Sequence, residues 1–179
     1  MIQPSIVIAS ITHDEQLSEA RISRVKRVNL MAGNINTLQS IIHSLHQADK
    51  QVYVHIDMVQ GIGRDASFIQ YLAEHFKPDG IITTKSQAIS AAKLAGLKTI
   101  QRFFAIDSSA IETAIKMIQS SQPHEVEIMP GLMPRIIQET KERISCPLIV
   151  GGLIRSNEEI EQALTSGADY VSIGDERFW

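Results

Sequence analysis

Eight short apolar runs, rich in β-branched residues, recur along the chain and constrain its fold more than any other feature. They begin about every 23 residues, which is the length of one compact strand-helix unit in a parallel sheet. The stretches between them carry helix-like patterns of apolar residues. The predicted strands occupy residues 6–9, 27–30, 52–57, 80–84, 99–104, 125–129, 148–150 and 170–173.

Eight strand-helix units close most economically as a parallel barrel with an outer ring of helices. The chain has 179 residues, whereas such barrels typically need about 250. No linker or low-complexity stretch divides it, so we expect residues 1–179 to form one α/β domain, a compact TIM-type (β/α)8 barrel. After the last predicted strand and Gly174, only residues 175–179 remain. We therefore expect the eighth helix to be missing or reduced to one turn.

Helix starts are predicted where a hydroxyl residue precedes Glu by three positions. This pattern occurs at Thr12, Ser109 and Ser156. In such a capping box the hydroxyl and the Glu side chain satisfy free backbone amides of the first turn.

Alternation along the strands sorts polar side chains into those that face the helices and those that face the barrel axis. In the third predicted strand the valines face the helices, which leaves Tyr53, His55 and Asp57 facing inward. In the sixth, the same alternation turns Glu125 and Glu127 inward. Because α/β barrels bind ligands at the carboxyl ends of their strands, we expect His55, Asp57 and Glu127 to line a polar pocket.

Lys85 and Arg102 are the cations expected near this pocket, at the end of the fourth strand and within the fifth. They can balance the carboxylates while Asp57 and Glu127 accept hydrogen bonds from ligand hydroxyl groups. A structural interpretation stays open for each residue, because charged side chains inside a barrel can form a satisfied polar layer. Arg102 in particular can pair with Glu127 or Asp57.

Gly151 and Gly152 end the seventh predicted strand and lead towards a helix. Two adjacent glycines let backbone amides approach a ligand closely, and the following helix adds its positive end. Many barrels bind phosphate between the loops after strands seven and eight, and Gly174 supplies the eighth-strand half. The alternative is that these glycines serve only a tight turn.

Composition bounds the class of function. A net charge of −3, a pI of about 6.1 and an aromatic content of 5% argue against a broadly basic, base-stacking surface. No apolar run approaches the roughly 20 residues that span a bilayer, and segment 1–9 lacks the basic residues of a signal peptide. The single cysteine, Cys146, precedes a proline and an apolar strand, as expected of an inert thiol. We expect a cytoplasmic protein without membrane contact.

In six segments the sequence resembles the glycerol uptake operon antiterminator regulatory proteins. The similar segments are 54–61, 78–85, 100–108, 126–131, 151–154 and the terminal Phe178-Trp179. They stand in the expected order and extend over nearly the whole chain, so the resemblance is specific.

This resemblance implies a cytoplasmic bacterial regulator with a small barrel fold. Such a protein binds glycerol 3-phosphate as an effector, without a cofactor, and acts on leader mRNA to prevent premature transcription termination. The resemblance also brings Gly131, in the Pro130-Gly131 motif, among the expected ligand-binding residues. It implies no catalytic residue.

A metal-dependent phosphosugar epimerase or isomerase is the competing interpretation. His55-x-Asp57 is similar to the strand end at which pentulose-phosphate epimerases bind a divalent metal, and a metal there would stabilise an enediolate. However, Lys85 stands where a further histidine is needed, and Gln60 stands where a second acidic residue is needed. We therefore expect no metal and no enzymatic activity. A ligand sensor that acts through a protein partner instead of RNA is the third possibility.

The expected lack of an eighth helix also bears on assembly. It would leave the outer apolar face of the first and last strands, including Val171 and Ile173, without a helix to cover it. Phe178 and Trp179 could cover part of this face. We therefore expect a two-fold symmetric homodimer.

Overall fold

The computed structural model describes residues 3–179, and these form a closed barrel of eight parallel strands. Met1 and Ile2, the start of the segment analysed as a possible signal peptide, lie outside the described residues. The strands are β1 (Val7–Ile11), β2 (Arg27–Leu30), β3 (Gln51–His55), β4 (Gly80–Thr83), β5 (Lys98–Phe104), β6 (Glu125–Met129), β7 (Leu148–Gly151) and β8 (Tyr170–Ile173). Each strand pairs in parallel with its sequence neighbours, and β1 closes the barrel against β8. The predicted fold class is confirmed.

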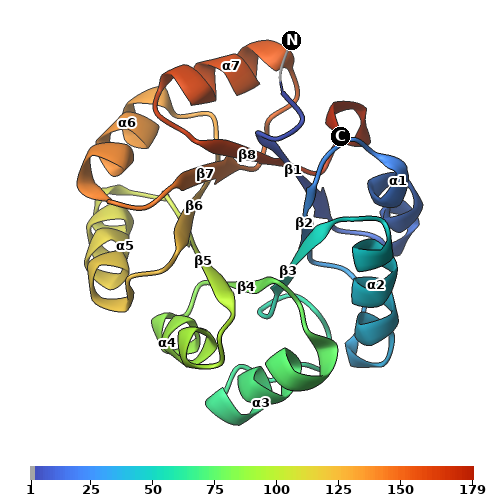
Figure 1. Cartoon of the computed structure of the whole chain (residues 1–179). Helices are drawn as coiled ribbons and strands as arrows, with labels where there is room; N and C mark the ends of the chain where they lie inside the picture. Colours follow the sequence, from blue (N-terminus) through green and yellow to red (C-terminus); the bar gives the residue numbers. More distant parts are fainter. Residues whose placement is uncertain (1–2) are drawn as a thin grey trace.

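In the described part of the chain, seven helices surround the barrel (Figure 1). They are α1 (Leu17–Ile22), α2 (Ile35–Gln47), α3 (Ala66–Tyr71), α4 (Ser86–Leu94), α5 (Ser108–Ser121), α6 (Pro134–Arg143) and α7 (Asn157–Thr165). A π-helical segment, Leu72–Phe76, continues α3, and the 3₁₀ turn Asp14–Gln16 precedes α1. Within residues 3–179, none of the helices has the length and apolar character needed to cross a membrane.

The helix starts confirm one capping box and correct two. Ser156 caps α7 through the amide of Glu159, as predicted. At α5 the cap is Asp107 instead of Ser109, because its carboxylate accepts the Ala110 amide at 2.7 Å. Near Thr12 the cap shifts to His13, where the side chain of Gln16 accepts the nearby amides.

The barrel interior is filled in three groups of side chains, because alternate strand residues point inward. At the amino ends of the strands, which we call the floor, lie Arg27, Tyr53, Glu125 and Tyr170. An apolar middle follows, consisting of Ile8, Ile82, Ile100 and Ile149. At the carboxyl ends, which we call the mouth, lie Ser10, Asn29, His55, Arg102, Glu127 and Ser172, all buried.

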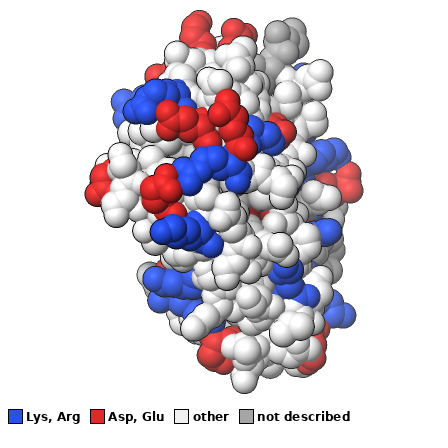
Figure 2. Space-filling view, turned by 90° about the vertical axis from the view of Figure 1, so that its left-hand side faces the viewer, with Lys and Arg blue, Asp and Glu red and all other residues white. Residues whose placement is uncertain are grey.

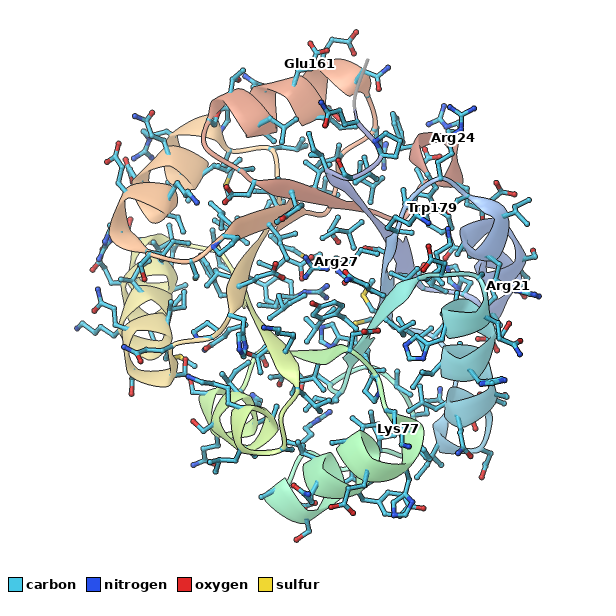
Figure 3. The ribbon with its side chains drawn as sticks, in the orientation of Figure 1. Arg21, Arg24, Arg27, Lys77, Glu161 and Trp179 are labelled. Atoms are coloured by element: carbon cyan, nitrogen blue, oxygen red, sulfur yellow. The ribbon has the colours of Figure 1, made fainter. Side chains whose placement is uncertain are left out.

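The eighth helix is reduced to the 3₁₀ turn Glu176–Phe178, as predicted. Figures 1 and 3 show this turn and Trp179 between α7 and α1. The indole of Trp179 donates to the carbonyl of Ile173 at 2.8 Å, and Phe178 and Trp179 both pack on the core. Val171 and Ile173 are buried. The expectation of an uncovered apolar face is therefore wrong, and the argument for a dimer that depended on it no longer holds.

Candidate ligand site at the mouth of the barrel

The mouth holds a cluster of polar side chains supplied by six different strands. Its members are Ser10 from β1, Asn29 from β2, His55 from β3, Arg102 from β5, Glu127 from β6 and Ser172 from β8. Each faces inward because its strand neighbours, such as Val28 and Leu30 beside Asn29, are buried in the layer between sheet and helices. A polar cluster of this kind is stable only if its donors and acceptors find partners.

Arg102 and Glu127 form an ion pair that leaves part of each side chain without a partner. The parallel register sets the two residues side by side on β5 and β6. Nε of Arg102 donates to Oε2 of Glu127 at 2.7 Å, with only 4% and 0% of the two side chains exposed. Among the described residues, Oε1 of Glu127 has no hydrogen-bond partner. Of the two partners considered for Arg102, the structure thus pairs it with Glu127.

Gly151 makes room for this carboxylate. A Cβ atom at position 151 would stand 3.1 Å from Oε1 of Glu127, and equally close to Met129 and to the carbonyl oxygen of Ser172. These contacts are tighter than a side chain normally tolerates. Gly151, which the sequence assigns to phosphate binding, therefore has a second role, because its lack of a side chain leaves room for the Glu127 carboxylate.

His55 is a neutral imidazole at physiological pH. Burial and, to a smaller extent, the positive charge of Arg102 together lower its pKa to about 3, while Asp57 opposes the shift. Within residues 3–179, neither Nδ1 nor Nε2 of His55 has a hydrogen-bond partner. A neutral imidazole carries one donor and one acceptor. Both are free for an oxygen-rich ligand.

Ser10, Asn29 and Ser172 complete the cluster, and our sequence reasoning missed all three. The hydroxyls of Ser10 and Ser172 lie 2.6 Å apart, and Nδ2 of Asn29 lies 3.5 Å from the Ser172 hydroxyl. The carbonyl Oδ1 of Asn29 has no partner in the described chain. The alternation that assigned Glu127 inward would also have found them, since each stands between two buried apolar residues of its strand.

Asp57 lies beside the cluster but is already engaged. Its carboxylate accepts hydrogen bonds from the hydroxyls of Thr83 and Thr84 and from the Thr84 amide at 2.7 Å. Nε of Arg64 adds an ion pair at 3.3 Å. Asp57 therefore joins the loop after β3 to the end of β4. Lys85 is also apart from the cluster, because it is the exposed residue that precedes α4.

The glycine loops after β6, β7 and β8 differ in what they offer. The amide of Gly131 donates to the Gly152 carbonyl at 3.2 Å, so Gly131 serves the turn. Gly152 adopts a φ of 79°, which favours glycine. Outside the strand ladders, the amides of Gly152 and Gly174 donate no backbone hydrogen bond among the described residues. Both amides lie just beyond the carboxyl ends of β7 and β8.

The acidic residue beside Gly174 does not oppose an anion there. Nη2 of Arg177 lies 2.5 Å from the Asp175 carboxylate, and hydrogen bonds from this guanidinium hold the pKa of Asp175 below its usual range. The charge of Asp175 is thus balanced within the C-terminal turn.

The residues proposed for metal chemistry do not come together. Within residues 3–179, no group of three or more His, Cys, Asp or Glu side chains is placed to hold a metal ion. Cys146 is partly buried, and burial raises the pKa of its thiol, as expected of an unreactive cysteine.

Known proteins are similar to this chain over nearly their whole length. The Escherichia coli (strain K12) protein YgcP is 31% identical over 179 residues, which cover 100% of this chain and 94% of YgcP. The glycerol uptake operon antiterminator regulatory protein from Listeria monocytogenes str. 4b F2365 is 30% identical with a TM-score of 0.93, covering 97% of this chain and 94% of that one. The glycerol uptake operon antiterminator-related protein from Thermotoga maritima MSB8 is 27% identical with a TM-score of 0.86, covering 98% of each chain.

The family assignment follows from these matches. Residues 7–179 match the model of a family described as glycerol-3-phosphate responsive antiterminator. The match leaves out only the first six residues, so it includes every strand that contributes to the mouth. The chain belongs to the glycerol-3-phosphate responsive antiterminator family, as the resemblance in its sequence predicts.

Proposed function

We propose that this protein is a cytoplasmic regulator that binds glycerol 3-phosphate at the barrel mouth and acts on the leader mRNA of glycerol-uptake genes, preventing premature termination. It has no catalytic role and needs no cofactor, since the phosphate ester is its effector. The family to which the chain belongs supports this ligand.

The unpartnered polar atoms of the mouth are the observation that carries the proposal. Oε1 of Glu127, Oδ1 of Asn29 and both ring nitrogens of His55 are buried without partners in the described chain. A buried polar group without a hydrogen bond costs free energy, so these atoms favour a ligand that supplies donors and acceptors. The two hydroxyl groups of glycerol 3-phosphate supply both.

The phosphate group is assigned to the glycine loops. We propose that the amides of Gly152 and Gly174 bind it, because backbone N–H groups at such turns hold anions well. Gly151 keeps the path to Glu127 free, and Gly131 shapes the adjoining turn. The polyol end then meets Glu127, His55 and Arg102, while Lys85 and Asp57 lie at the periphery.

Calorimetry tests the ligand assignment directly. The protein is titrated with glycerol 3-phosphate, glycerol, a pentulose phosphate and inorganic phosphate, and each binder is then assayed for turnover. We expect glycerol 3-phosphate to bind more tightly than its two halves, without being consumed. Tighter binding of the pentulose phosphate, accompanied by turnover, would favour the epimerase or isomerase interpretation.

RNA would be bound by a surface with only a modest excess of positive charge. On the face shown in Figure 2, Lys and Arg side chains are interleaved with Asp and Glu. Because the net charge is −3, we propose that a homodimer presents two such surfaces to one RNA, which raises the apparent affinity without new contacts. Light scattering at micromolar concentration tests the dimer. Binding to leader RNA across a salt series tests the contact, since phosphate contacts weaken steeply as salt rises.

A protein partner in place of RNA is favoured by one observation. Large exposed apolar side chains stand at the end of β5 and on the loops that follow β3, β5, β6 and β7, namely Met58, Phe104, Ile106, Leu132 and Leu153. All but Phe104 are non-aromatic, and such side chains suit a protein surface better than stacked bases. A ligand-dependent complex with a protein, together with RNA binding that does not respond to glycerol 3-phosphate, would favour this second function.

A further inference from the structure

The guanidinium of Arg102 is covered by two methionines. Nη1 and Nη2 each lie 3.6 Å from the sulfur of Met31, and Nη1 lies 3.9 Å from the sulfur of Met58. A guanidinium has five N–H donors, and only the Nε–H of Arg102 bonds to the Glu127 carboxylate. Thioether sulfur is a weak acceptor. The outer half of this buried cation is thus held by poor partners.

The two methionines differ in how easily they can move. Met31 is 8% exposed and directly follows β2, whereas Met58 is 49% exposed on the loop after β3. A methionine side chain has three rotatable bonds and adapts to different surroundings at low cost. Met58 can therefore leave Arg102 for solvent, while Met31 remains packed.

The backbone around Met58 is fixed on both sides. Before it, the carboxylate of Asp57 is bonded to Thr84, and the Met58 amide donates to the His55 carbonyl at 3.0 Å. After it, Gln60 is bonded to Gly33 and Ile35. Any movement here belongs to the side chain of Met58 and not to the loop.

We infer that Met58 is a displaceable cover of the ligand site. An oxygen-bearing ligand takes Nη1 and Nη2 of Arg102 from the methionine sulfurs, and the Met58 side chain turns outward. The exchange is favourable because a charge-assisted N–H···O bond is much stronger than a contact to sulfur. This inference rests on the proposed function, since glycerol 3-phosphate is the ligand that would displace Met58. It also links occupancy of the site to a change at the exposed rim of the mouth.

Methyl resonances of methionine report the displacement. Protein carrying 13C in the methionine methyl groups is titrated with glycerol 3-phosphate, and Met31→Leu and Met58→Leu variants assign the signals. We expect the Met58 methyl to shift with the same saturation curve that calorimetry gives. Met117, on α5 outside the barrel, is the internal control and should not respond.

Removal of the cover gives a second, independent measurement. In Met58→Ala the ligand no longer has to displace a side chain, so its affinity should rise by about 3- to 10-fold. Leu132→Ala is the matched control, because Leu132 is also an exposed apolar residue at the mouth but belongs to the loop after β6. Its affinity should stay unchanged.

The outcomes separate this inference from the proposed function. If glycerol 3-phosphate binds but the Met58 methyl stays fixed, or if Met58→Ala binds more weakly, Met58 is not a cover and the proposed function stands. If the native protein takes up no glycerol 3-phosphate in calorimetry, the proposed function fails and the inference fails with it.

Discussion

The barrel contains two Arg–Glu pairs, one at each end, and they differ in completeness. At the floor, Nη1 and Nη2 of Arg27 both donate to the carboxylate of Glu125. The guanidinium carbon also lies 4.2 Å from the ring centre of Tyr53 and 5.5 Å from that of Tyr170. Figure 3 shows Arg27 inside the barrel. At the mouth, Arg102 donates only its Nε–H to Glu127 and turns the rest of its guanidinium towards two sulfurs.

This difference separates a structural pair from a binding site. A buried ion pair is stable only when further hydrogen bonds satisfy the remaining donors and lone pairs. The floor pair is bidentate and enclosed by aromatic faces, although Nε of Arg27 has no partner among the described residues. The mouth pair leaves a carboxylate oxygen and most of a guanidinium unsatisfied, and it is the more deeply buried of the two. The unmet hydrogen-bonding capacity is therefore concentrated where a ligand can enter.

Truncation of the two glutamates is the strongest test of this contrast. Glu127→Ala leaves Arg102 buried without its carboxylate, so we expect a loss of about 3–5 kcal/mol of unfolding free energy. Glu125→Ala should cost about 1–2 kcal/mol, because its side chain is 16% exposed and Arg27 keeps its tyrosines. Urea unfolding measures both.

Binding distinguishes the same pair of positions. Glu127→Gln preserves the shape of the side chain and should lower glycerol 3-phosphate affinity by about 10- to 100-fold, the value of one charged hydrogen bond. Glu125→Gln should leave the affinity unchanged. Equal effects of the two substitutions would contradict the assignment of separate roles to the mouth and the floor.

Two glycines with the same backbone conformation, one at each end of the barrel, allow a second comparison of the mouth and the floor. Gly152 at the mouth has a φ of 79°, and Gly96, before β5 at the floor, has a φ of 80°. In both places a Cβ has room, since its nearest neighbours lie 3.8 Å away at Gly152 and none lies within 4 Å at Gly96. Valine at either position should cost about 1–2 kcal/mol through its left-handed backbone. Only Gly152→Val should abolish binding of phosphate esters in calorimetry. If this variant still binds them, the loop after β7 does not hold the phosphate.

The histidines of the two ends should differ in their effect on stability at low pH. The pKa of His55 is about 3 in the folded protein and near 6.5 when unfolded, so the unfolded chain takes up a proton that the folded one cannot. Stability is therefore complete above about pH 6.5 and declines as pH falls towards 3, by up to about 1.4 kcal/mol per pH unit. Urea unfolding between pH 7 and 5 should show a shallower decline in His55→Gln.

His124 supplies the control at the floor. Burial lowers its pKa as well, but its Nδ1 lies 2.9 Å from the Thr99 hydroxyl and accepts the Thr99 amide at 3.2 Å. His124→Gln should change the pH dependence less than His55→Gln does. The reverse order would mean that His55 is accessible to protons and not held neutral at the mouth.

Local periodicity predicts the barrel and the inward direction of its polar residues. Strand alternation depends only on neighbouring residues, so it places His55 and Glu127 inside without knowledge of the rest of the fold. It applies equally to Ser10, Asn29 and Ser172, which a search restricted to charged residues overlooks.

Such local patterns do not predict the contacts that are made across the barrel. The cover that Met31 and Met58 form over Arg102 joins three strand ends that lie far apart in the sequence. Glu112 fits a capping box in the sequence, but Arg143 on α6 pairs with it in the structure. Likewise, only the packed position of Trp179 shows that the last strand is covered.

Asp57 gives the smallest expected effect and shows that position at the mouth does not by itself make a ligand residue. Its carboxylate is bonded to Thr83 and Thr84, much as Asp79 near the floor accepts the Val52 amide at 2.7 Å and contacts His46. We expect Asp57→Asn and Asp79→Asn each to lower stability by about 1 kcal/mol, since a hydrogen-bonded carboxylate is lost in both. Each should change glycerol 3-phosphate affinity by less than about 3-fold, because both oxygens of Asp57 already accept hydrogen bonds and Asp79 lies at the opposite end of the barrel. Calorimetry with glycerol 3-phosphate and with inorganic phosphate checks this. A selective loss of glycerol 3-phosphate binding in Asp57→Asn alone would show that the polyol replaces a threonine, and would extend the ligand site beyond His55 to the residue Asp57 after β3.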